Sequence, residues 1–136
     1  DHAPHTLEEK SNKYLKCPSG APLVQHSLNV MLEYYKKDKI SLEKIVEKMC
    51  HNPAILFEIE KRGFVKEGYK ADLVLVDLNK EYTVSKENIL YKCGWSPLEN
   101  ETFHSEITHT FINGNLAYEK GRFSDEKFGE RLLFER

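Results

Sequence analysis

The sequence lacks the features that mark several common classes of protein. It has no basic excess, because 20 lysine and arginine residues stand against 22 aspartate and glutamate residues, for a net charge of −2. This balance excludes a nucleic-acid binder that works by bulk electrostatics, since such binding needs cations that displace counterions. No apolar run approaches the roughly 18–20 residues that span a bilayer, so we expect no membrane segment and no membrane partner.

Cysteine is also scarce. The chain has three cysteines, Cys17, Cys50 and Cys93, and no C-x-x-C pair. This pattern indicates neither a structural zinc site nor a disulfide framework. It is typical of reduced thiols in a cytoplasmic protein, which is where we expect the protein to reside.

The 136 residues have the mass of one ordinary domain, 15.9 kDa, yet the chain changes character along its length. Residues 1–62 begin with a polar segment, which we expect to be a long loop through residue 19, and continue with helical patterns. Residues 63–120 have the pattern of strands and turns, and residues 121–136 form a charged tail. The composition therefore predicts a mixed α/β chain in two parts.

The helical part carries recognisable start and stop signals. Apolar residues at helical spacing predict a helix that follows Pro22. Ser41 predicts the N-cap of a second helix. Asn52 followed by Pro53 predicts the start of a third helix, and Gly63 is its expected C′ residue.

The second part carries two strand signals. The near-continuous apolar run of residues 71–77 predicts a strand that is buried on both faces. Residues 107–112 and 115–118 flank Asn113 and Gly114, a dipeptide that favours a tight hairpin because both turn positions need a positive φ.

The residues that carry chemistry stand at the start of the chain, in the string Asp1-His2-Ala3-Pro4-His5-Thr6. A carboxylate can bind a metal or move a proton, and an imidazole can bind a substrate carboxylate. From residue types alone, an active-site loop and a polar tail with chance histidines fit this string equally well.

The string resembles the motif that follows the eighth barrel strand in dihydroorotases, which belong to the amidohydrolase superfamily. The resemblance continues over nearly the whole chain. It includes a proline- and glycine-containing turn (Pro18-Ser19-Gly20-Ala21-Pro22), an Asn-Pro-Ala helix (residues 52–54), a G-x-x-A-D-L-V-x-x-D strand (residues 68–77), and the segments 95–98 and 110–114.

The resemblance implies an α/β fold: the C-terminal fragment of a metal-dependent (β/α)8 barrel hydrolase plus part of a small β-sandwich. Residues 1–62 would end the barrel, residues 63–120 would contribute to the sandwich, and residues 121–136 would form a tail. The sandwich would be completed by strands from the start of the parent chain. The rest of that chain is therefore an expected partner, and a homodimer stays open.

The resemblance also implies roles for individual residues. Asp1 matches the catalytic aspartate that contacts the metal and shuttles a proton. His5 matches the imidazole that holds the substrate carboxylate. The backbone of Ser19 and Gly20 matches the turn that hydrogen-bonds the substrate ring, and His2 is left without a direct role.

The other metal ligands of the family would lie upstream of Asp1. Asp1 would therefore be the only ligand that this chain contributes to the one or two zinc ions of the parent enzyme. His26, His51, His104 and His109 do not replace them. We expect His26 and His51 to be structural residues with satisfied ring nitrogens, and His104 and His109 to pack on the surface or between strands.

The implied activity is the reversible conversion of dihydroorotate and N-carbamoyl-L-aspartate in pyrimidine biosynthesis, with small molecules as substrates. Residues 1–136 alone should be inactive, because a catalytic zinc needs about three protein ligands. Two alternatives remain: another cyclic amidohydrolase, such as an allantoinase, hydantoinase or dihydropyrimidinase, and a non-catalytic dihydroorotase-like scaffold subunit.

Overall fold

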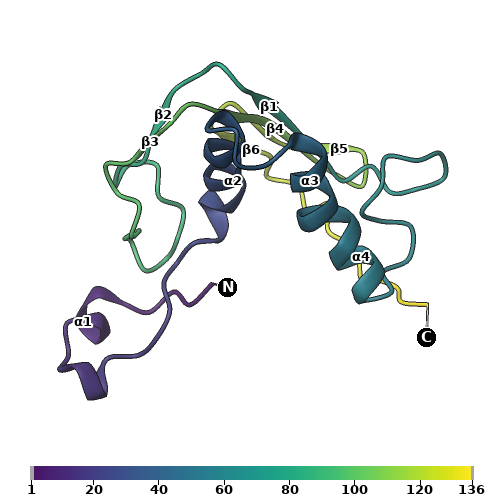
Figure 1. The fold of residues 1–136 in the computed structure, drawn as a ribbon. Coiled ribbons are helices and arrows are strands. Elements are labelled where there is room, and N and C mark those ends of the chain that lie inside the picture. The colour runs from purple at the N-terminus through teal and green to yellow at the C-terminus, as the bar shows by residue number, and fades with distance from the viewer. Residues whose placement is uncertain (1, 136) are drawn as a thin grey trace.

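The computed structural model describes residues 2–135 and combines helices with antiparallel sheet (Figure 1). The helical elements come first in the chain: α1 (Leu7–Lys10), η1 (Tyr14–Lys16), η2 (Val24–His26), α2 (Ser27–Lys36), α3 (Leu42–Val46), η3 (Glu47–His51) and α4 (Asn52–Leu56). The strands follow: β1 (Leu73–Asp77), β2 (Tyr82–Thr83), β3 (Thr102–Phe103), β4 (Glu106–Ile112), β5 (Asn115–Glu119) and β6 (Arg122–Phe123). The predicted order of helices before strands is confirmed.

The helix expected after Pro22 is present as η2 and α2. It buries His26, Asn29 and Leu32. Asn29 donates a hydrogen bond of 2.9 Å from its side chain to the carbonyl oxygen of Ser105, directly before β4. This polar contact between buried groups ties α2 to the strands, and Figure 1 shows α2, α3 and α4 on the same side of the sheet.

The next helices are continuous rather than separated. Ser41 caps α3 as predicted, because its hydroxyl accepts a hydrogen bond of 3.2 Å from the backbone N–H of Lys44. The predicted N-cap at Asn52 is wrong, since Asn52 has helical dihedrals and α3 runs into α4 through η3, a π-helical turn. Proline has no backbone N–H to donate to the preceding turn of a helix. A wider π-helical turn directly before α4 is a place where a continuous helix can accept Pro53.

Gly63 has a different role from the one predicted. The helix ends at Leu56, and Glu58 has the positive φ of 54° that follows it. Gly63 itself has a φ of +80° and lies so close to α4 that an added Cβ would be 2.4 Å from the Cβ of Ala54. A glycine is needed there for both the dihedral and the close approach.

The larger sheet is antiparallel and has the strand order β1-β4-β5-β6, while β2 and β3 form a separate pair. The predicted hairpin is confirmed: β4 and β5 are joined by Asn113 and Gly114, whose φ values are 51° and 83°. Positive φ at both positions is the requirement of a type I′ turn.

The prediction that residues 71–77 form a strand buried on both faces is wrong. β1 is present, but it is an edge strand that pairs with β4 alone among the described strands. Leu73, Val74 and Leu75 are between 36% and 49% exposed. A strand with this composition is typical of a covered sheet, so its exposure shows that the described residues do not supply the cover.

The buried core is small. Its apolar members are Leu32, Ile45, Ala54, Val84 and Phe103. Across residues 2–135, no helix combines the length and the apolar character that crossing a membrane requires. The three cysteines are free thiols, as predicted.

Candidate functional site

The candidate site is the N-terminal loop, which we define as residues 2–22. Its two ends are joined by a backbone hydrogen bond of 3.0 Å from the N–H of Ala3 to the carbonyl oxygen of Ala21. The loop lies beyond the N-terminal end of α2, away from α3 and α4 (Figure 1). Polar contacts therefore hold this loop in a defined shape outside the main body of helices and sheet.

The loop contains more regular structure than its sequence pattern predicted. Thr6 and Glu9 form a capping box around α1: the Thr6 hydroxyl accepts from the Glu9 N–H at 3.2 Å, and Glu9 Oε2 accepts from the Thr6 N–H at 2.9 Å. This Thr-x-x-Glu spacing is a known start signal, and it could have revealed α1 from the sequence.

Glu9 also faces the first predicted substrate-binding residue. Its Oε2 lies 3.6 Å from Nδ1 of His5, whose side chain is 37% exposed. The hydrogen bond from the Thr6 backbone, followed by the nearby His5, lowers the pKa of Glu9. The carboxylate thus stays ionised at neutral pH and sits beside one ring nitrogen of His5.

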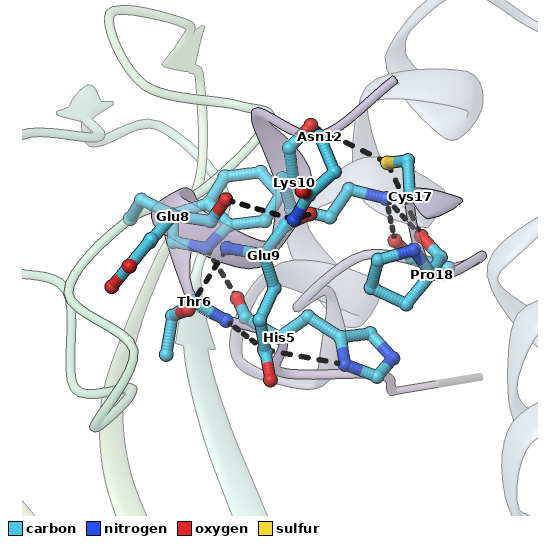
Figure 2. A network of polar contacts seen from close by, with 10 residues as sticks. His5, Thr6, Glu8, Glu9, Lys10, Asn12, Cys17 and Pro18 are labelled. Atoms are coloured by element: carbon cyan, nitrogen blue, oxygen red, sulfur yellow. Dashed lines mark hydrogen bonds and ion pairs between the residues drawn. The ribbon is translucent and has the colours of Figure 1, made fainter. Parts of the chain in front are cut away.

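Lys10 holds the second predicted substrate-binding element, the Ser19–Gly20 turn. Its ammonium donates hydrogen bonds to the carbonyl oxygens of Pro18 at 2.7 Å and Gly20 at 3.0 Å. The Sγ of Cys17 lies 3.3 Å from the carbonyl oxygen of Lys10. Figure 2 shows this network, with His5 and Pro18 approached from the same short helix.

Two aromatic residues from the segment between β2 and β3 reach the N-terminal loop. The indole N–H of Trp95 donates to the carbonyl oxygen of His5 at 2.7 Å. The ring of Tyr91 lies 5.2 Å from the ring of His2, centroid to centroid, and its hydroxyl accepts from the backbone N–H of Gln25 at 2.9 Å. The strand-bearing part of the chain thus fixes the position of the loop.

Asp1 lies outside the described residues. His5, Ser19 and Gly20 belong to one loop and are connected through α1. His2 is exposed and lies against Tyr91. The sequence reasoning missed Lys10 and Trp95, whose partners are backbone carbonyls and therefore leave no trace in residue spacing.

The described residues do not fit a metal ion. Among residues 2–135, no three histidine, cysteine, aspartate or glutamate side chains come together as a metal site. His5 and Glu9 form a pair only. The chemistry that the described loop can perform is the binding of an anionic or polar ligand through the imidazole and the exposed backbone of the turn.

A cavity of about 300 Å³ lies apart from the loop, between the start of α2 and the sheet. His26 lines it with an exposure of 1%, in ring contact with Tyr82, Tyr91 and Phe103. His26 was predicted to have satisfied nitrogens, which is wrong, since both are buried without a hydrogen-bond partner in the described chain. Burial lowers the pKa of His26.

The comparisons with known proteins agree with this architecture. The model of the amidohydrolase family matches residues 9–117. A dihydroorotase of Pyrococcus furiosus is 36% identical over 98% of this chain and 31% of its own length. An allantoinase of Desulfitobacterium hafniense is 29% identical over 97% of this chain and 30% of its own.

The fold has counterparts among solved structures as well. A D-hydantoinase (dihydropyrimidinase) from Thermus sp. superposes with a TM-score of 0.85 at 23% identity, over 93% of this chain and 29% of that protein. The chain thus spans about a third of the length of the proteins it matches. By its sequence from the N-terminal loop to β5, the chain belongs to the amidohydrolase family.

Proposed function

We propose that residues 1–136 supply the C-terminal portion of a cyclic amidohydrolase that interconverts dihydroorotate and N-carbamoyl-L-aspartate. The observation that carries this proposal is the geometry of the N-terminal loop. His5 and the Ser19–Gly20 turn are held by Glu9 and Lys10, two consecutive residues of α1. A cation-capable side chain and a hydrogen-bonding turn on one loop suit a substrate that carries both a carboxylate and a cyclic amide.

In this proposal, His5 binds the substrate carboxylate and the backbone of Ser19 and Gly20 binds the ring. Asp1 takes a proton from the attacking water, which adds to the ring carbonyl, and returns it to the ring nitrogen as the carbon–nitrogen bond breaks. In the reverse direction the same carboxylate accepts the proton of the attacking nitrogen. The family resemblance places only Asp1 of this chain among the ligands of the one or two zinc ions.

We further propose that the rest of a longer chain covers the exposed face of β1. The chain has an accessible surface of 10145 Å², against about 7,400 Å² for a compact monomer of its mass. The exposure of the apolar side chains of Leu73, Val74 and Leu75 supports the proposal that another segment packs on β1. Residues 1–62 then complete a (β/α)8 barrel and residues 63–120 form part of a β-sandwich. Residues 121–136 form a C-terminal tail, whose first residues pair with β5 as β6.

A second candidate is a cyclic amidohydrolase whose substrate is a cyclic amide without a carboxylate, such as allantoin, hydantoin or dihydrouracil. The similarity to the Desulfitobacterium hafniense allantoinase over 97% of the chain favours it. The two candidates differ in what His5 does, because a ring that has no carboxylate offers the imidazole no charged group of the substrate.

The test is an assay of the full-length protein containing residues 1–136, supplied with zinc, on dihydroorotate, dihydrouracil, hydantoin and allantoin. We expect turnover of dihydroorotate, and a loss of about 10²–10⁴-fold in kcat for D1N, the range of general acid–base catalysis. The tail substitution D125N is the matched control. Turnover of allantoin or hydantoin without dihydroorotate would transfer the proposal to the second candidate.

A further inference from the structure

We infer that Glu9 and Lys10 are a pair of positioning residues, each of which orients one substrate-contacting element of the N-terminal loop. This inference rests on the proposed function, which assigns His5 and the Ser19–Gly20 turn to the substrate. Glu9 and Lys10 make side-chain contacts within the loop, at His5, Thr6, Pro18 and Gly20. Their contacts fix the positions of His5 and the Ser19–Gly20 turn relative to α1.

Lys10 acts on the two peptide groups that flank the Ser19–Gly20 pair. Its ammonium binds the carbonyl oxygens of Pro18 and Gly20, which turns both carbonyls toward α1. In a trans peptide the N–H points opposite to the carbonyl, so the N–H groups of Ser19 and Ala21 point away from Lys10. Within residues 2–135 neither N–H donates to another residue, which makes both suitable donors for a ligand.

The turn itself is built for close backbone approach. Gly20 has a φ of +86°, in the left-handed region where a side chain is strained. Two carbonyls of such a turn would repel one another if both faced the same side without a cation between them. The half-buried ammonium of Lys10 supplies that cation, and it forms charge-assisted hydrogen bonds to both oxygens.

Glu9 acts on the imidazole. The capping box fixes its carboxylate at the start of α1, where Oε2 lies 3.6 Å from Nδ1 of His5. Trp95 holds the backbone of the same histidine through its carbonyl oxygen. With Nδ1 facing a carboxylate, Nε2 is the nitrogen that can meet a substrate.

The first experiment replaces Lys10 in the full-length protein. We expect K10M to raise KM for dihydroorotate about 10-fold or more while kcat changes by less than about 2-fold, because a lost charged hydrogen bond is worth about a factor of ten. K10R should restore most of the loss, since its guanidinium can bind both carbonyls. K13M is the control, as Lys13 is an exposed lysine of the same loop.

The second experiment replaces Glu9. E9Q keeps the capping box, which accepts glutamine as well as glutamate, but removes the charge beside His5. We expect a rise in KM of about 3- to 10-fold, in line with the loss of a partly exposed charged contact. The matched control is E8Q, an exposed carboxylate in the same turn. No residue of α1 is buried, so these variants are expected to fold.

A readout without turnover separates this inference from the proposed function. The backbone amide chemical shifts of Ser19 to Ala21 should change in K10M and not in K13M, whatever substrate the enzyme takes, because K10M frees the carbonyls that Lys10 binds. An inactive wild-type protein would overturn the proposed function alone. Kinetic constants and amide chemical shifts in K10M equal to those in K13M would overturn the positioning role of Lys10. An E9Q enzyme with the same KM as E8Q would overturn that of Glu9.

Discussion

The N-terminal loop and the body of helices and sheet are held together in contrasting ways. In the loop, α1 and η1 bury no residue, and order comes from the capping box, from Lys10 and from Trp95. In the body, order comes from backbone ladders and close packing, as at Gly63 against Ala54, yet much apolar surface stays exposed. The difference teaches that hydrogen bonds alone can fix the conformation of a polar loop, whereas the sheet needs other segments to bury its apolar surface.

The largest expected effect is on the packing of the body. G63A should destabilise the full-length protein by about 3 kcal/mol or more, because it combines a left-handed φ with overlap onto Ala54 and the carbonyl oxygen of Cys50. G68A is the matched control, since Gly68 has a φ of +79° in open space and should lose only about 1 kcal/mol. Urea unfolding measures both, and equal losses would contradict close packing at Gly63.

The second effect tests the cover over β1. L75K should destabilise the full-length protein by about 2 kcal/mol, because a covered strand would bury the new charge. V65K, at a site that is 90% exposed, should change the free energy of unfolding by less than about 0.5 kcal/mol. If L75K proves as harmless as V65K, the face of β1 is open in the complete protein.

The third effect tests the joint between the two regions. W95F keeps an aromatic ring but removes the hydrogen bond to the His5 carbonyl, which is worth about 1 kcal/mol. We expect KM for dihydroorotate to rise about 5-fold, with a small change in thermal stability. Y14F, at an exposed residue of the same loop, serves as the control. Unchanged KM in W95F would show that the loop keeps its shape without the body.

The smallest effect concerns His26 in the cavity. Burial lowers its pKa from 6.5, so the unfolded state takes up a proton more readily than the folded state. Stability should therefore fall as the pH drops below about 6.5 toward the lower folded-state pKa. H26F keeps the aromatic contacts, should gain about 1 kcal/mol or less, and should flatten that slope in unfolding curves measured from pH 7.5 to 5. If the free energy of unfolding of H26F depends on pH as steeply as that of the wild type, groups other than His26 cause the pH dependence.

The sequence predicted the features that depend on local backbone chemistry. Ser41 caps α3, and Asn113 with Gly114 turns the β4–β5 hairpin. In both cases a short pattern has one favourable local solution, a side-chain cap or a pair of positive φ values. The resemblance to dihydroorotases was likewise confirmed at the level of the family, because its motifs extend over the whole chain.

Features that depend on distant partners escaped prediction. The burial of β1 was predicted from composition alone, but whether a strand is covered depends on other segments. Asn52 has the residue type of a cap, yet the preceding turn continues the helix into α4. Within the site, His5, Ser19 and Gly20 were predicted through the family resemblance. Lys10 and Trp95 escaped prediction because they bind backbone oxygens, which residue spacing does not reveal.

Trp95 has a further consequence as a spectroscopic reporter. It is the single tryptophan of these 136 residues, and its indole N–H is bound to the loop it positions. Indole emission responds to the polarity and hydrogen bonding around the ring, so the fluorescence of this chain reports whether the N-terminal loop is docked. A change in Trp95 fluorescence would therefore report that the N-terminal loop has separated from the body of helices and sheet.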